Sequence, residues 1–134
     1  MTVATGEQAL ASDVNALKSF EVVNSETRDL TAAAGDVAYT SYGFQPTALI
    51  IFAYGNGAMS WGIADGTTDL CLSWRSDATA GPHAWLIEND QTANNARAVL
   101  KSFDADGFTL TWTKTNTPTG TLTMQVLAIR QGVI

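Results

Sequence analysis

The segment that decides the fold runs from Phe108 to Ile129 and reads FTLTWTKTNTPTGTLTMQVLAI. Apolar residues alternate with threonine or other polar residues on both sides of a Pro/Gly-containing turn, which is the two-residue period of a half-buried strand. Threonine is β-branched and favours strands. The segment therefore predicts a hairpin whose second strand, apolar on both faces beyond Val126, is central or lies against a partner chain. Its predicted buried side chains are Phe108, Leu110, Trp112, Leu122 and Met124.

Short strand-like runs of this kind fill the chain from residue 36 onward. The run Thr47–Tyr54 is apolar on both faces and predicts a central strand, and the Asn56-Gly57 pair after it is a tight-turn signal. We count eight or nine such strands and no helical period long enough for a crossover helix. Residues 36–134 are therefore predicted to form an all-β domain, an antiparallel jelly-roll-like β-sandwich. Its predicted core is completed by Leu49, Ile51, Leu70, Leu72 and Trp74.

Residues 1–35 differ in composition from the rest and are predicted to form a separate N-terminal arm. Leu10, Val14 and Leu17 recur at the spacing of one helix face, so the arm is expected to contain a brief helix of about two turns. Phe20 extends this set of apolar anchors. Two interpretations stay open: the arm packs on another protein, or its helix folds back on its own domain.

Composition excludes several classes of function. The chain has 134 residues, enough for one domain, with 46% apolar and 15% charged residues and a formal net charge of −6. An acidic surface repels phosphate backbones, so no nucleic-acid partner is expected. The longest apolar run, Ala48 to Tyr54, is far shorter than a membrane span, and the N-terminus lacks the pattern of a secretory signal. The single cysteine allows neither an internal disulfide nor a cysteine-based zinc site.

Few residues suggest catalysis or metal binding. His83 is the only histidine, and no Gly-x-Ser-x-Gly motif supplies a nucleophile for it, while Cys71 falls inside a predicted strand. The Asp104-Ala105-Asp106-Gly107 segment lacks the later ligands of a calcium loop and is better explained as a hairpin turn. Glu88 ends an apolar run with no second carboxylate to pair with. The sequence therefore predicts no catalytic residues, no metal site and no cofactor.

The four tryptophans raise a different possibility, the binding of sugars by stacking. Trp74 and Trp112 are in phase with leucines on their strands and are assigned to the core. Trp61 and Trp85 are less constrained by the pattern, which makes them the candidates for glycan stacking.

Several segments, in their order along the chain, resemble bacteriophage virion structural proteins. Residues 6–17, ending in ASDVNAL, are similar to an opening segment of phage tail-fibre and related structural proteins. GFQPTALIIF at 43–52 resembles a strand start of such proteins, and SWGIADG at 60–66 resembles the segment that follows it. SFDADGFTLTW at 102–112 looks like their closing hairpin, and VLAIR at 126–130 looks like their final strand.

This resemblance implies a non-enzymatic β-sandwich protein that forms homotrimers. Because the chain is small, it fits a capsid decoration (cement) protein on the outer capsid surface of the virion, with the major capsid protein and itself as partners. The anchors Leu10, Val14, Leu17 and Phe20 would then contact the capsid or an adjacent subunit. The alternatives are a tail-fibre or baseplate component, and a carbohydrate-binding module that uses Trp61 or Trp85 to recognise host glycans.

Overall fold

The computed structural model describes residues 21–75 and 78–131, and for residues 78–81 it describes the backbone alone. These residues form ten strands arranged in two antiparallel sheets. Nine of the strands lie from residue 35 onward, which equals the upper sequence-based count for that region, and the tenth lies within the predicted arm. The strands are β1 (Glu21–Asp29), β2 (Gly35–Tyr39), β3 (Ala48–Gly55), β4 (Ala58–Ala64), β5 (Asp69–Arg75), β6 (Ala78–His83), β7 (Ile87–Gln91), β8 (Asn94–Asp104), β9 (Gly107–Thr115) and β10 (Thr121–Ile129).

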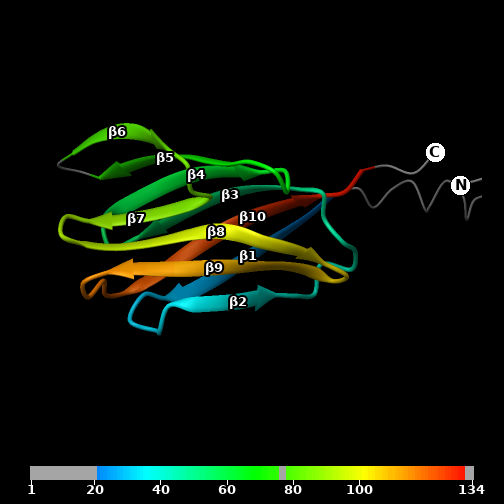
Figure 1. Cartoon of the computed structure of the whole chain (residues 1–134), viewed down its shortest axis with the longest axis horizontal. Helices are drawn as coiled ribbons and strands as arrows, with labels where there is room; N and C mark the ends of the chain where they lie inside the picture. The colour runs from blue at the N-terminus through cyan, green and yellow to red at the C-terminus, as the bar shows by residue number, and fades with distance from the viewer. Residues whose placement is uncertain (1–20, 76–77, 132–134) are drawn as a thin grey trace, which may run out of the picture.

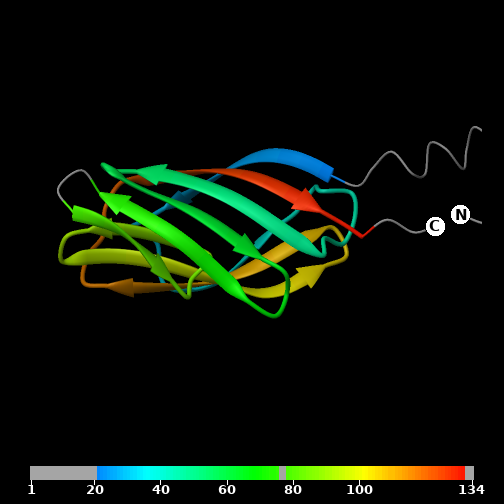
Figure 2. The same ribbon diagram turned by 90° about the horizontal axis from the view of Figure 1, so that it is seen from above.

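The two sheets pack face to face as a β-sandwich, which confirms the predicted all-β class. The larger sheet has the order β1-β10-β3-β4-β5-β6, and the smaller has the order β2-β9-β8-β7. Figure 1 shows the smaller sheet in front of the larger one, and Figure 2 shows the two layers from above. The strands β3 and β10 are both central, as their apolar faces predict.

The core lies between the sheets and contains most of the predicted residues. Leu49, Ile51, Phe108, Leu110, Trp112, Leu122 and Met124 are all buried, as the alternating pattern predicts. The indole of Trp112 keeps its polar group satisfied by donating from Nε1 to the hydroxyl of Tyr39 over 3.2 Å. Tyr39 also stacks on Phe108 with ring centroids 5.3 Å apart.

The core assignment is wrong for β5, where the predicted phase is inverted. Leu70, Leu72 and Trp74 point to solvent, while Cys71 and Ser73 point into the sandwich. Alternation separates the residues of a strand into two sets but does not show which set faces inward. In β5 the set with the smaller side chains faces the core. The inward position of Ser73 lets its hydroxyl donate to the buried carboxylate of Glu88 over 2.9 Å.

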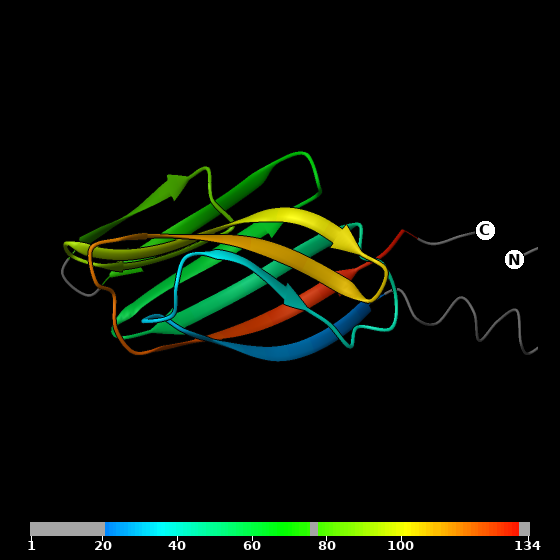
Figure 3. The same cartoon turned by 60° about the horizontal axis from the view of Figure 1, so that its bottom comes forward.

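The sandwich begins earlier than the predicted boundary between residues 35 and 36. Within the predicted arm, β1 pairs along its whole length with β10, from Glu21 opposite Ile129 to Asp29 opposite Thr121. Figure 3 shows β1 beside β10 at one margin of the larger sheet. A pairing partner a hundred residues away leaves no local signal in the sequence. The predicted helix with Leu10, Val14, Leu17 and Phe20 lies outside the described residues.

The Asp104–Gly107 segment forms the turn between β8 and β9, as predicted. Its second aspartate fixes a neighbouring loop: Asp106 accepts hydrogen bonds from the backbone amides of Ser41 and Gly43, at 3.0 and 2.7 Å. Asp104 accepts from the hydroxyls of Ser102 and Thr109. These carboxylates therefore act as connectors between strands and loops.

Candidate functional site

The outer face of the larger sheet is covered by large apolar side chains. Nine large hydrophobic residues of the described chain are exposed, by 36 to 68%, and all nine lie on this face. They come from β1, β3, β4 and β5 and are Val23, Phe52, Tyr54, Met59, Trp61, Ile63, Leu70, Leu72 and Trp74. We call these nine residues the apolar face.

Strand register joins them into three rows across the sheet, because residues opposite each other on paired strands point to the same side. The first row is Thr27, Thr123, Tyr54, Met59 and Trp74. The middle row is Ser25, Gln125, Phe52, Trp61, Leu72 and Pro82. The third row is Val23, Leu127, Ile50, Ile63 and Leu70.

No residue in these three rows is charged at neutral pH, and the exposed acidic residues Glu21 and Asp29 lie at the two ends of β1, outside the rows. Trp61 lies near the centre, and its ring meets Phe52 edge-on with centroids 5.3 Å apart. A depression of about 350 Å³ opens beside Trp61, lined among others by Leu72 and Pro82. Exposed apolar patches of this extent mark interaction sites on soluble proteins.

The opposite outer face, on the smaller sheet, carries polar and charged side chains. Thr111 on β9 donates to Asp36 on β2 over 2.7 Å, and Lys101 on β8 forms an ion pair with the same carboxylate. Exposed Thr113 continues this polar surface. The two outer faces therefore differ in chemistry, and among the described residues the large exposed apolar side chains are those of the larger sheet.

The two predicted glycan-stacking residues are not brought together. Trp61 is 58% exposed on the apolar face, and its cross-strand neighbours Phe52 and Leu72 are both apolar. Trp85 lies in the connection between β6 and β7, half-buried, with the guanidinium of Arg97 5.2 Å from its ring centroid. Stacking on a sugar needs polar groups beside the ring to bind hydroxyls, and the strands flanking Trp61 supply Phe52 and Leu72 instead.

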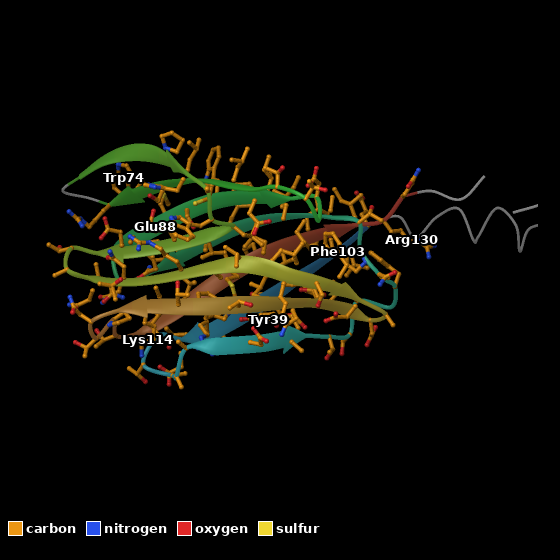
Figure 4. All side chains as sticks on the ribbon, viewed as in Figure 1. Tyr39, Trp74, Glu88, Phe103, Lys114 and Arg130 are labelled. Carbon is orange, nitrogen blue, oxygen red and sulfur yellow. The ribbon has the colours of Figure 1, made fainter. Side chains whose placement is uncertain are left out.

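The interior holds one cluster of chemically active side chains, built around Glu88. This carboxylate is buried and accepts two hydrogen bonds, from Arg97 at 2.8 Å and from Ser73 Oγ at 2.9 Å. The Nε2 atom of His83 lies 3.0 Å from the oxygen that Ser73 binds. The backbone amide of Glu88 donates to Ser60 Oγ over 3.2 Å. The cluster joins strands of both sheets, and Figure 4 shows Glu88 and Trp74 at the same end of the molecule.

The arrangement of this cluster differs from that of a catalytic triad. In a triad the histidine stands between nucleophile and carboxylate, whereas here Ser73 and His83 both bind the same oxygen of Glu88. Cys71 lies directly opposite His83 in the β5–β6 ladder, but burial and the charge of Glu88 raise the pKa of its thiol to about 12. A catalytic cysteine needs the opposite shift, since its thiolate is the nucleophile.

Among the described residues there is no group of three or more metal-ligating side chains of the His, Cys, Asp and Glu type. The part of the chain that the structure describes also contains no helix that is long and apolar enough to cross a membrane.

Most of the apolar face is not predictable from the sequence pattern. Leu70, Leu72 and Trp74 are predicted in the core but are exposed, and no role is predicted for the exposed Met59 and Ile63. One signal was present: the run Thr47–Tyr54 is apolar at consecutive positions, which a strand with one face in water does not need.

Comparisons with protein-family models, with curated proteins and with solved structures find no match for this chain.

Proposed function

We propose that this chain is a non-enzymatic structural protein of a bacteriophage virion, a capsid decoration protein that forms a homotrimer on the outer shell. The observation that carries this proposal is the apolar face, because such an uncharged sheet surface suits a protein that works through contacts with other proteins. The resemblance of its segments to phage virion proteins is the reason for placing the protein in a phage virion.

The interior cluster supports a role without catalysis. Glu88 already accepts hydrogen bonds from Ser73 and Arg97, and His83 lies within 3.0 Å of it. Cys71 is buried, with a pKa far above neutrality. The contacts of Glu88 with Ser73, His83 and Arg97 link strands of both sheets, which is a structural role.

The strand order supports the finer description of the fold as jelly-roll-like. β1 pairs with β10 in the larger sheet, and β2 pairs with β9 in the smaller one. The first two strands and the last two thus form nested antiparallel pairs that span both sheets, as in a rolled ribbon. The β3–β6 meander then widens the larger sheet and creates the surface on which the apolar face lies.

In this proposal the segment before β1 attaches the protein to the shell. Leu10, Val14, Leu17 and Phe20 are its apolar anchors, and they contact the major capsid protein or an adjacent subunit. A trimer presents three such segments at once, and this avidity strengthens contacts that are weak one by one.

Two other functions are tested by the same experiment. A tail-fibre or baseplate subunit would use the same sandwich at another place in the virion. A glycan-binding module is favoured by the exposure of Trp61, and it is opposed by the apolar cross-strand neighbours of that ring, Phe52 and Leu72.

The test uses capsids of the virus that encodes this chain, stripped of accessory proteins, and tails purified from the same particles. We expect the full chain to co-sediment with capsids, and a variant lacking residues 1–20 to lose that binding while keeping the circular dichroism of the sandwich. Binding to tails alone would replace the capsid assignment with the tail assignment. Binding to neither, together with retention on a glycan array, would overturn the virion proposal in favour of the glycan-binding module.

A further inference from the structure

We infer that the apolar face is the surface through which copies of this chain contact one another. The inference rests on the proposed function, since it treats the protein as an assembling structural subunit, and it adds the surface and the partner. The first argument is that all the exposed large hydrophobic side chains of the described residues gather on one side of one sheet. Scattered apolar residues are normal on a surface, whereas a single continuous face needs a partner.

The size of the face matches what a stable contact needs. Its four aromatic side chains are 45 to 58% exposed. An aromatic side chain can bury roughly 150–250 Å², so these four present on the order of 400 Å². The five aliphatic members add a comparable area, which brings the face to about the 800 Å² per partner of a standard interface.

The chemistry of the face restricts its partner to a surface that is itself uncharged. A charge opposite Trp61 or Leu72 would be buried without a counter-ion, which is costly. The protein as a whole carries a net charge of −6, and its other outer sheet face is polar. The one uncharged, apolar surface found on the described chain is this face, so a second copy meets the requirement.

Other occupants fit less well. Residues 1–20 offer Leu10, Val14, Leu17 and Phe20 as apolar anchors, too few to cover nine large side chains spread over four strands. A lipid surface is unsuited, because biological membranes are negatively charged and the chain is acidic. A shell protein as occupant is distinguished by the experiment below.

The experiment places one charge in the middle of the face. Leu72 pairs with Trp61 across the β4–β5 ladder and is 53% exposed, so the substitution Leu72→Lys leaves the core untouched. Its matched control is Ala38→Lys, which adds the same charge at an exposed position on β2, in the smaller sheet. Both variants are compared with the wild-type chain by size exclusion with light scattering, and circular dichroism verifies that each is folded.

We expect the wild-type chain and Ala38→Lys to form the same oligomer, with a mass near twice 14.2 kDa where two faces meet and near three times 14.2 kDa where three faces meet around an axis. Leu72→Lys is expected to raise the dissociation constant by about 100-fold or more and to elute as a monomer at micromolar concentration. Acrylamide quenching of tryptophan fluorescence gives a second measurement on the unaltered chain: Trp61 and Trp74 become more accessible as dilution separates the copies.

The inference is overturned if the wild-type chain is a monomer at high concentration, or if Leu72→Lys keeps the wild-type mass. A monomer that still binds capsids would retain the capsid-decoration role, contradict the homotrimer and assign the apolar face to the shell. An oligomer that Leu72→Lys dissociates, but that binds no virion component, would retain the inference and contradict the proposed function. A dimer in place of a trimer would support the shared surface and contradict the trimer alone.

Discussion

The carboxylate of Glu88 lies in the interior, where it accepts hydrogen bonds from Arg97 and Ser73 and lies 3.0 Å from Nε2 of His83. A buried charge is tolerated when it is paired and hydrogen-bonded, and removal of one partner exposes the others to the cost of burial. This residue had no visible mate in the sequence, because its partners come from three other strands. Only the fold brings those strands together.

We predict that Glu88→Gln lowers the free energy of unfolding by about 2–3 kcal/mol, because the amide loses the charge that Arg97 requires and places an NH₂ group among donors. Guanidinium denaturation at one protein concentration measures the change. Glu21→Gln is the control, since Glu21 is exposed at the start of β1, and its effect should stay within about 0.5 kcal/mol. Equal stabilities of the two variants would show that the cluster contributes little.

At the scale of single elements, β5 shows what an alternating pattern can and cannot predict. The pattern correctly predicts that Asp69–Arg75 is a strand. It cannot predict which side of that strand faces inward, and the inward side here is the one with Cys71 and Ser73. In β9 and β10 the inward side can be predicted, because polar residues, mostly threonine, alternate with the apolar residues that face the core.

The strand β4 depends on a glycine for its fit against the smaller sheet. A Cβ added at Gly62 would lie 1.7 Å from the carbonyl oxygen of Leu86. The backbone of Leu86 is itself fixed, since its amide donates to the carbonyl of Ala98 over 2.9 Å. The approach of β4 to the start of β7 is therefore possible only without a side chain at this position.

We predict that Gly62→Ala destabilises the protein by about 3 kcal/mol, because the added methyl group forces β4 and Leu86 apart. Gly57→Ala is the matched comparison: its φ of +78° strains an alanine, but nothing lies within 4 Å of the new Cβ. Its cost should be only about 1 kcal/mol. Chemical denaturation measures both, and a smaller effect at Gly62 than at Gly57 would contradict the close contact.

For the whole molecule, the architecture was more predictable than the site. Turn signals and alternation are local, so they predicted the all-β sandwich and its central strands. The apolar face depends on which sides of β1, β3, β4 and β5 look outward, and that is decided by register across four strands. The composition, 46% apolar, does not predict which of the apolar residues lie at the surface.

The charged groups of the whole molecule also predict how its stability depends on pH. Hydrogen bonds from Thr31, Lys101, Thr68 and Thr109 are the main causes that lower the pKa values of four aspartates. These are Asp29, Asp36, Asp65 and Asp104. A carboxylate with a lowered pKa stabilises the folded state above its unfolded value of about 3.9, and this contribution is lost as the pH falls through the folded value. Burial raises the pKa of Asp69, which acts in the opposite direction.

Since four aspartates outweigh one, we predict that the melting temperature falls steadily between about pH 4 and pH 2. Asp65→Asn tests the cause, because an amide oxygen can still accept from the Thr67 and Thr68 amides that Asp65 binds at 2.9 and 2.8 Å, but carries no charge. The variant should melt below the wild-type chain at pH 7, and the two should converge by about pH 2, where the wild-type carboxyl is protonated. A difference that persists at pH 2 would show that the geometry of the amide, and not the charge of Asp65, accounts for the loss.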